Sequence, residues 1–221
     1  MRLLIATGNR HKLEEIGDLL RAIPDLEIVS LRDFPDIEMP PETGATMREN
    51  ARIKALHCAH QSGLPSLADD SGIEVPALDD EPGVHSVRWI QGSDEDRMLA
   101  LLGRVNDCGA RMSTHAAGHD EKTAEDARAA RYRCAICLCF PDGVALESEA
   151  RCEGRIAPAP RGENGFGYDP IFEITAATQA PPEWIGCTMA EAPPQVKAQV
   201  SHRARALQKL VQKTKLQQPN S

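Results

Sequence analysis

The chain has 221 residues, of which 41 % are hydrophobic and only 4 % aromatic, so it can bury a mostly aliphatic core. Its formal charge of −8 argues against a non-specific nucleic-acid binder, which would be basic, although one local basic pocket would still admit a nucleotide. No apolar run approaches the roughly 18 residues of a membrane span, and the apolar stretch at 1–7 is too short for a signal peptide. We therefore expect a single domain over residues 1–221, in the cytoplasm and away from membranes.

The cysteines number seven, and an odd count without an export signal fits reduced thiols better than a disulfide framework. Cys134, Cys137 and Cys139 fall on one predicted strand. The Cys134-x-x-Cys137 spacing has no second pair and no turn between its members. We interpret these residues as buried core cysteines rather than as a metal or redox site.

The first elements alternate between strands and helices. Residues 3–6 predict a buried strand, Thr7-Gly8-Asn9 predicts a turn, and apolar residues at helical spacing predict a helix that ends before Pro24. Lys12 lies at the start of this helix, where backbone N–H groups attract anions. The spacing matches neither standard phosphate-binding glycine loop, and an ordinary capped helix would explain it equally well. The next expected elements are a strand at 26–30, a proline-rich loop at 33–44 and a helix at 46–61 that is stopped by Gly63.

The stretch from Leu67 to Val75 brings two adjacent acids, Asp69 and Asp70, after a short apolar run. Adjacent acids at the end of a strand are costly to bury, because like charges repel and desolvation opposes ionisation. A divalent cation would remove that cost. Taken alone, however, the residues Asp-Asp-Ser-Gly are better explained as a turn between apolar segments at 65–68 and 73–75.

The second half predicts another helix and a hairpin. The helix is expected at 93–105, where Ser93 and Asp96 resemble a capping box. The polar residues 106–127 predict an exposed connection whose His115 and His119 are solvated rather than zinc ligands. Two long strands joined by a hairpin favour a mixed sheet over a purely parallel one. The remaining expected elements are strands at 131–140 and 144–153, a glycine-rich loop at 162–170, a short strand at 171–174, an irregular segment at 179–194, a last helix from 201 and a frayed tail at 213–221.

Each of several motifs has an ordinary structural explanation when taken alone. Together they supply phosphate donors, metal ligands and a stacking ring. They are Ala6-Thr7-Gly8-Asn9-Arg10-His11-Lys12, Glu42-Thr43-Gly44 with Glu49-Asn50-Ala51-Arg52-Ile53-Lys54-Ala55, Ala68-Asp69-Asp70-Ser71-Gly72, Pro82-Gly83-Val84-His85-Ser86-Val87-Arg88-Trp89, Gly165-Phe166-Gly167-Tyr168-Asp169-Pro170-Ile171-Phe172 and Ser201-His202-Arg203. In this order the chain resembles the inosine triphosphate pyrophosphatases over nearly its whole length. The resemblance implies a mixed α/β fold in which helices flank a long bent central sheet, with two lobes, a nucleotide cleft between them, and a homodimer. It also implies Mg²⁺-dependent hydrolysis of ITP, dITP or XTP to the monophosphate and pyrophosphate, which cleanses the nucleotide pool.

The resemblance also assigns roles to individual residues. Glu42 and Asp70 are expected to bind Mg²⁺, and Asp70 is the family's proton acceptor. On chemistry alone, either Asp69 or Asp70 could activate the attacking water. Phe166 is expected to stack on the purine, worth about 1–3 kcal/mol. The other expected substrate contacts are Thr7, Gly8, Asn9, Arg10, His11, Lys12 and Lys54 at the phosphates, Ser71 at the nucleotide, and Gly167, Tyr168, Asp169, Lys197, His202 and Arg203 around the base.

Selectivity follows from the base edge. Lys197 and Arg203 only donate hydrogen bonds, so they would pair with O6 of hypoxanthine or xanthine and clash with the amino group of adenine. Rejection of GTP, which also carries O6, is not explained. The chain departs from the family pattern at His85, where an aromatic is usual, at Met47 and at 192–196. The alternatives are a pyrophosphatase of the same fold that acts on modified pyrimidine nucleotides, and a catalytically silent nucleotide-binding regulator.

Overall fold

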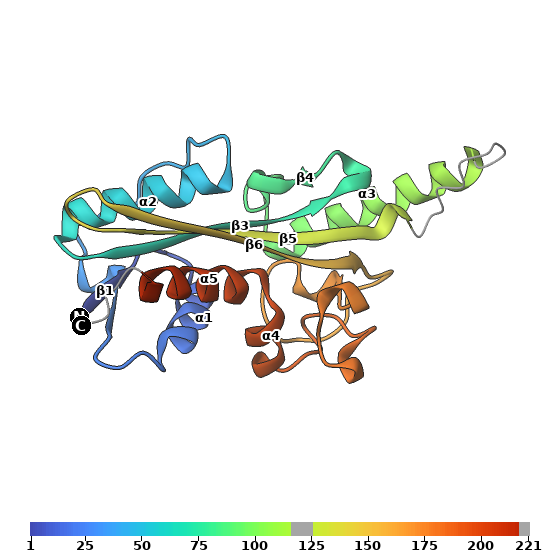
Figure 1. The fold of residues 1–221 in the computed structure, drawn as a ribbon. Coiled ribbons are helices and arrows are strands. Elements are labelled where there is room, and N and C mark those ends of the chain that lie inside the picture. The colour runs from blue at the N-terminus through green and yellow to red at the C-terminus, as the bar shows by residue number, and fades with distance from the viewer. Residues whose placement is uncertain (116–125, 217–221) are drawn as a thin grey trace. The chain divides into compact units, whose positions relative to one another are not determined.

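The computed structural model describes residues 1–115 and 126–216 (Figure 1). A seven-stranded sheet has the order β2-β1-β3-β5-β6-β7, and β4 pairs with β3 off this path. β1 runs parallel to β2 and β3, whereas β4 and β7 run antiparallel to their partners, so the predicted mixed α/β class is confirmed. The strands are β1 (Arg2–Ile5), β2 (Glu27–Ser30), β3 (Ser66–Val75), β4 (Glu81–Pro82), β5 (Ala129–Cys139), β6 (Ala145–Ile156) and β7 (Phe172–Glu173). The α-helices are α1 (Arg10–Leu20), α2 (Met47–Ser62), α3 (Asp94–His115), α4 (Pro194–Val200) and α5 (His202–Leu216).

The chain forms two compact units, each with its own hydrophobic core. Unit 1 comprises Met1–Ser71, Cys134–Arg151 and the chain from His202 onward. Unit 2 comprises Gly72–Arg133 and Cys152–Ser201. Strands β3, β5 and β6 contribute residues to both units. That residues 1–221 behave as one domain stays a prediction.

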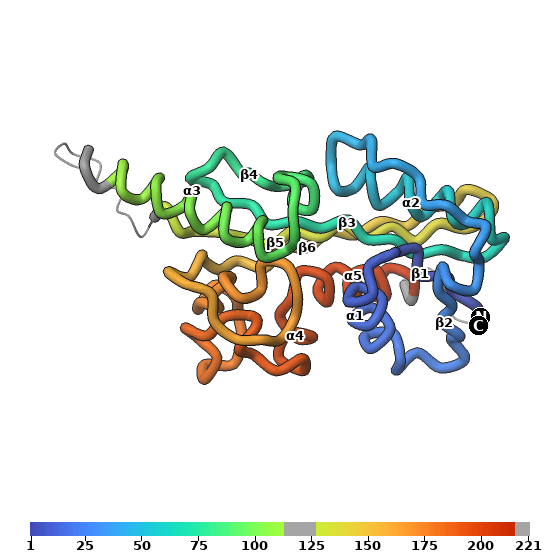
Figure 2. The backbone as a smooth tube through the Cα atoms, turned by 180° about the vertical axis from the view of Figure 1, so that it is seen from behind, coloured from blue at the N-terminus to red at the C-terminus, as the bar shows by residue number. Residues whose placement is uncertain are grey.

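In unit 1, α2 lies on one face of the sheet and α1 and α5 lie on the other, as both views show (Figures 1 and 2). The aliphatic core joins Leu3 and Ile5 of β1 to Ile16 of α1 and Leu207 of α5. The opposite face is covered by the buried small side chains of α2, which allow the helix to approach the sheet closely.

Local signals set the ends of α2 as expected. The Thr46 side chain accepts a hydrogen bond from the Glu49 N–H, and the Glu49 side chain accepts from the Thr46 N–H, which forms a capping box. Gly63 ends the helix with a left-handed φ of 67°, which glycine adopts without a steric penalty. The predicted hairpin is confirmed as well, because the Phe140 N–H donates to the Val144 carbonyl across the turn at 2.8 Å.

The acidic stretch is not a turn. β3 runs without interruption from Ser66 to Val75, so the prediction of two apolar segments around an Asp-Asp-Ser-Gly turn was wrong. The register pairs Leu4 with Ser66 and Ile5 with Leu67, so β1 ends just before the level of the acids. Turn-forming residue types were outweighed here by tertiary context, because β3 is buried along nearly its whole length.

In unit 2, α3 is longer than expected. The Ser93–Asp96 capping box is present, since the Ser93 N–H donates to Asp96 Oδ2 at 2.7 Å and the Asp96 N–H donates to Ser93 Oγ at 3.1 Å. The helix then continues to His115, so the prediction of an exposed connection from residue 106 was wrong for residues 106–115. Cys108 explains part of the extension, because it packs against the core of unit 2. His119, and the side chain of His115, lie outside the described residues.

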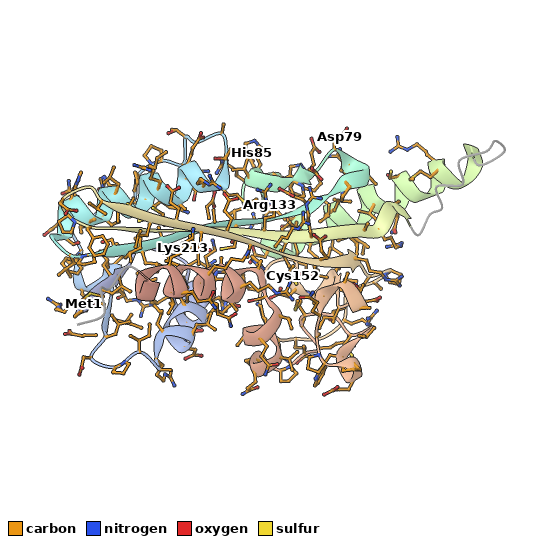
Figure 3. The ribbon with its side chains drawn as sticks, in the orientation of Figure 1. Met1, Asp79, His85, Arg133, Cys152 and Lys213 are labelled. Atoms are coloured by element: carbon orange, nitrogen blue, oxygen red, sulfur yellow. The ribbon has the colours of Figure 1, made fainter. Side chains whose placement is uncertain are left out.

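The end of the chain also differs from the expectation. α4 begins at Pro194, a residue that suits the first turn of a helix, and was missed in a proline-rich segment. α5 continues to Leu216, so the frayed tail predicted from residue 213 was wrong for residues 213–216. Lys213, labelled in Figure 3, donates to the Glu147 carbonyl and so holds the last turns of α5 against β6. Residues 217–221 lie outside the described part of the chain.

The seven cysteines are free thiols. Cys134, Cys137 and Cys139 are buried on β5, in agreement with the interpretation as core residues. Cys152, labelled in Figure 3, is likewise buried in the core of unit 2. None of the helices among the described residues is both long and apolar enough to cross a bilayer.

Candidate active site

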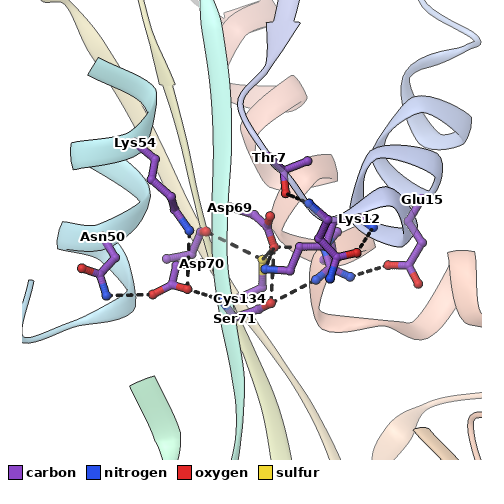
Figure 4. A network of polar contacts seen from close by, with 12 residues as sticks. Thr7, Lys12, Glu15, Asn50, Lys54, Asp69, Asp70, Ser71 and Cys134 are labelled. Atoms are coloured by element: carbon purple, nitrogen blue, oxygen red, sulfur yellow. Dashed lines mark hydrogen bonds and ion pairs between the residues drawn. The ribbon is translucent and has the colours of Figure 1, made fainter. Parts of the chain in front are cut away.

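β3 directs its two acids to opposite faces of the sheet (Figure 4). Successive side chains of a strand alternate between faces, so Asp69 and Asp70 cannot act as a side-by-side pair. Asp69 points toward α1 and α5, and Asp70 points toward α2. Each acid therefore has its own set of partners, and all of these partners belong to unit 1.

Asp69 is a fully buried carboxylate held by two cations. Its Oδ2 lies 3.0 Å from Lys12 Nζ and 3.1 Å from Arg203 Nε. Ser71 Oγ also donates to Oδ2, at 3.3 Å. Burial alone would raise the pKa of Asp69, but the charges of Lys12 and Arg203 outweigh it and hold the pKa well below its usual range. Asp69 is therefore ionised, and its negative charge is balanced by Lys12 and Arg203.

Arg203 is buried and uses all three guanidinium nitrogens within unit 1. Besides Asp69, it donates to Glu15 through Nη1 and to Ser71 Oγ through Nη2 at 3.0 Å. Burial opposes its charge, but Asp69 and Glu15 raise its pKa above the usual value. Glu15 was not among the predicted site residues. The signal was its position three residues after Lys12, which places both on one helix face.

Asp70 shares a cation with a second acid. Lys54 Nζ lies 2.7 Å from Glu42 Oε1 and 3.7 Å from Asp70 Oδ1, so one ammonium faces two carboxylates. Burial raises the pKa of Asp70, and Glu42 raises it further, which together outweigh the opposing charge of Lys54. Burial lowers the pKa of Lys54, but the surrounding acids more than reverse this, so Lys54 stays charged.

Asn50 joins the loop of Glu42 to Asp70, and sequence analysis did not place it in the site. Its Nδ2 donates to Asp70 Oδ2 at 3.0 Å, and its Oδ1 accepts the Gly44 N–H at 2.8 Å. A Cβ on Gly44 would lie 2.6 Å from the Glu49 Cβ, so only glycine fits there. The available signal was an asparagine four residues before Lys54 on the same helix face.

The turn before α1 is exposed and ordered by its own side chains. Thr7 Oγ1 accepts the Asn9 N–H at 3.2 Å, and Asn9 Oδ1 caps the helix by accepting the Lys12 N–H at 3.2 Å. Arg10 faces solvent and pairs with Glu14 one turn later. Gly8 meets no steric limit from the protein, because an added Cβ would have no neighbour within 4 Å. His11, also predicted at the phosphates, is exposed on this first turn.

A second cluster lies in unit 2. Lys197 Nζ of α4 lies 2.6 Å from Asp169 Oδ2 and 4.7 Å from the centroid of the Phe166 ring. The Phe166 N–H donates to the same Asp169 oxygen at 2.9 Å. A Cβ on Gly165 would lie 2.1 Å from that oxygen, so this tight turn requires glycine. Gly167, with a φ of 62°, continues the turn, and Tyr168 donates to the Ser86 carbonyl at 2.9 Å.

The predicted site residues thus fall into two groups. Unit 1 contains the acids, both lysines of the phosphate end, Ser71 and the buried His202 and Arg203. Unit 2 contains the predicted base-binding loop and Lys197. Lys197 and Arg203, both predicted at the base edge, belong to different units, and Arg203 contacts Asp69. That the two residues share the base edge stays a prediction.

Residues 3–213 match the model of the Ham1 family. The chain belongs to the Ham1 family. Relatives include the dITP/XTP pyrophosphatase of Syntrophobacter fumaroxidans, 44 % identical with 94 % of this chain and 79 % of the relative covered. A dITP/XTP pyrophosphatase of Thermus thermophilus is 40 % identical, with 96 % and 91 % covered.

Solved structures of Ham1 proteins agree with the fold. A HAM1 protein from Coxiella burnetii is 34 % identical and superposes with a TM-score of 0.77, covering 98 % of this chain and 99 % of that protein. The Nucleoside-triphosphatase / dITP/XTP pyrophosphatase of Mycobacterium abscessus is 38 % identical with a TM-score of 0.66, covering 96 % and 99 %. The family resemblance seen in the separated motifs is therefore confirmed for this Ham1 chain.

Proposed function

We propose that the chain hydrolyses noncanonical purine nucleoside triphosphates, namely ITP, dITP and XTP, to the monophosphate and pyrophosphate. The observation that carries the proposal is the arrangement around Asp70. This acid shares Lys54 with Glu42 and is oriented by Asn50, in a chain 44 % identical to a dITP/XTP pyrophosphatase. We further propose that it acts as one domain and as a homodimer on the nucleotide pool of the cytoplasm.

The donor set fits Mg²⁺. Glu42 and Asp70 offer hard carboxylate oxygens, and Lys54 balances only one of the two negative charges. Mg²⁺ typically takes one or two carboxylates and fills its other positions with water and phosphate oxygens. Within residues 1–115 and 126–216, no group of three or more His, Cys, Asp or Glu side chains is placed to hold a metal. Bound by Glu42 and Asp70, Mg²⁺ would neutralise phosphate charge and make water more acidic.

Asp70 is the proton acceptor in this proposal, and Asp69 is not. The attacking water gives its proton to Asp70 while its oxygen bonds to the α-phosphorus, and the bond from this phosphorus to the leaving pyrophosphate breaks. Asn50 holds Oδ2 and the Ser71 N–H holds Oδ1 at 3.1 Å, so the carboxylate has a fixed orientation. A carboxylate held in a fixed orientation within reach of the attacking water can accept its proton. Asp69 serves instead to fix Lys12 and Arg203.

The turn from Thr7 to Lys12 would bind the phosphates. Exposed N–H groups at the start of α1, an 11-residue helix, favour an anion, and Gly8 leaves room for one. Asp69 keeps the ammonium of Lys12 beside this turn. Lys54 adds positive charge on the other face of β3.

The cluster in unit 2 would bind the base. Phe166 offers a ring for stacking, and Lys197 offers a donor that matches O6 and not the amino group of adenine. Asp169 contacts the protein donors around it rather than lying open to solvent, with only 3 % of its surface exposed. We assign it a positioning role.

One assay tests the function. The purified protein is incubated with Mg²⁺ and dITP, XTP, dATP, dGTP or 5-methyl-dCTP, and pyrophosphate and orthophosphate are measured separately. We expect pyrophosphate as the primary product and dITP and XTP as the preferred substrates. Preference for the methylated pyrimidine would replace the proposed substrate class, and absence of turnover on every nucleotide would refute the enzymatic proposal.

A further inference from the structure

The hydroxyl of Tyr132 on β5 points into the base-binding cluster of unit 2. It donates to Asp169 Oδ1 at 3.2 Å, and its ring stacks on Phe172 with centroids 4.3 Å apart. Only 7 % of Tyr132 is exposed, so substrate has little access to it. Burial and the neighbouring Asp169 raise the pKa of Tyr132 well above its usual value, so the phenol stays protonated and remains a donor.

Asp169 links Tyr132 to two other groups of the cluster, because its two oxygens accept from different donors. Its Oδ1 takes the hydroxyl of Tyr132, while its Oδ2 takes Lys197 Nζ and the Phe166 N–H. Tyr132 therefore helps to fix the plane of the carboxylate through Oδ1. The carboxylate in turn positions the Lys197 ammonium and the backbone of Phe166 through Oδ2. Because all four residues are in unit 2, the arrangement is defined within one compact body.

We propose that Tyr132 is a positioning residue that sets the preference for 6-oxo purines by fixing Asp169, and through it Lys197 and Phe166. The inference rests on the proposed function and extends it to a residue outside the family motifs quoted above. Without the hydroxyl, Oδ1 loses this donor while Oδ2 keeps Lys197 and the Phe166 N–H, so the carboxylate can tilt about Oδ2 and shift the Lys197 ammonium. A misaligned donor no longer distinguishes an acceptor at O6 from an amino group.

The substitution Tyr132→Phe isolates the hydroxyl, because the ring and its stacking on Phe172 are kept. KM for dITP is expected to rise about 5- to 20-fold. A buried hydrogen bond to a charged group is lost, and part of its free energy is expressed as weaker binding at the base site. The dITP-to-dATP ratio of kcat/KM is expected to fall by about 10-fold. The value of kcat should change less than about 2-fold, because Asp70 and its partners belong to unit 1.

Thr178→Val is the matched control. Thr178 is fully buried in unit 2, and its hydroxyl donates to the Glu153 carbonyl at 2.7 Å and accepts the Thr175 N–H at 2.8 Å, so the control also removes one buried hydroxyl together with its contacts. Melting temperatures of both variants are measured beside their kinetics. A loss of stability in Thr178→Val at least as large as in Tyr132→Phe, with a change in KM and selectivity only in Tyr132→Phe, would support the inference.

Three results are distinguishable. If the wild-type protein does not release pyrophosphate from dITP, the proposed function fails. If the wild-type protein is active and Tyr132→Phe keeps KM and the dITP-to-dATP ratio, the positioning role is overturned. The same conclusion follows if Thr178→Val changes both quantities as much as Tyr132→Phe does, because general loosening of unit 2 would then explain them.

Discussion

The opposed orientation of the two acids predicts opposite phenotypes for two variants that differ by one position. Asp69→Asn and Asp70→Asn each replace a buried carboxylate by an amide of the same shape. If the acids formed one catalytic pair, both variants would lose turnover and keep their stability. The structure predicts instead that Asp69→Asn unfolds more easily and that Asp70→Asn stays folded without activity.

The magnitudes follow from the partners of each acid. Asp69→Asn leaves Lys12 with no countercharge at 3.0 Å and removes one of the two acids bound to Arg203. Breaking a buried ion pair from one side typically costs about 3–5 kcal/mol, so the free energy of unfolding should fall by that amount. Asp70→Asn removes a charge that burial disfavours and leaves Lys54 paired with Glu42. Its unfolding free energy should change by less than about 1 kcal/mol.

Activity should show the reverse order. Loss of a general base typically lowers kcat by about 10²–10⁴-fold, which we expect for Asp70→Asn. Asp69→Asn should keep a measurable kcat and raise KM, because Lys12 is less well placed at the phosphate turn. Urea denaturation and steady-state hydrolysis of dITP measure both quantities. Equal destabilisation of the two variants, or wild-type turnover by Asp70→Asn, would contradict the separate roles of the two acids.

Three further predictions concern neighbouring contacts. Asn50→Ala should weaken Mg²⁺ binding, measured by calorimetry as well as by activity, by about 10–100-fold, since residues behind a metal ligand typically contribute this much; unchanged affinity would contradict the role of Asn50. Phe166→Leu should raise KM for dITP by about 5–150-fold, which corresponds to a stacking contribution of about 1–3 kcal/mol, and an unchanged KM would remove Phe166 from the base site. The last prediction concerns acid: because the pKa of Asp69 is lowered in the folded state, its stabilisation is full above its ordinary pKa near 4 and is lost as pH falls further. The difference in unfolding free energy between the wild type and Asp69→Asn should therefore shrink from pH 5 to pH 2, and a constant difference would refute the assignment.

The parts of the fold that could be predicted from sequence depend on local signals. The boundaries of α2 follow from the Thr46–Glu49 capping box and from Gly63, and the hairpin follows from its Pro-Asp-Gly turn. These signals act within a few residues, so their energies do not depend on the rest of the chain. The predicted end of α3 came too early, because residues after 105 are mostly polar and only a few of them, such as Cys108, pack against the core.

The functional partners were harder to predict because their contacts span the chain. Arg203 reaches Glu15 across 188 positions, and Tyr132 reaches Asp169 across 37. No spacing rule along one helix or strand connects such residues. The recurring motifs identified which stretches matter, yet they did not show that Arg203 contacts the acids while Lys197 belongs to unit 2. That assignment requires the topology of the sheet.

The charges around β3 show why the two acids take different roles. On the face of Asp69, two acids, Asp69 and Glu15, contact two cations, Lys12 and Arg203, so the contacts balance. On the face of Asp70, two acids, Asp70 and Glu42, contact one cation, Lys54, so one negative charge remains among these three groups. Burial makes such an excess costly, as the raised pKa of Asp70 shows. A divalent cation held by Asp70 and Glu42 would relieve that excess, whereas on the other face the acids already contact Lys12 and Arg203. The balance of charge therefore supports the proposal that the metal binds, and the proton is transferred, on the Asp70 face.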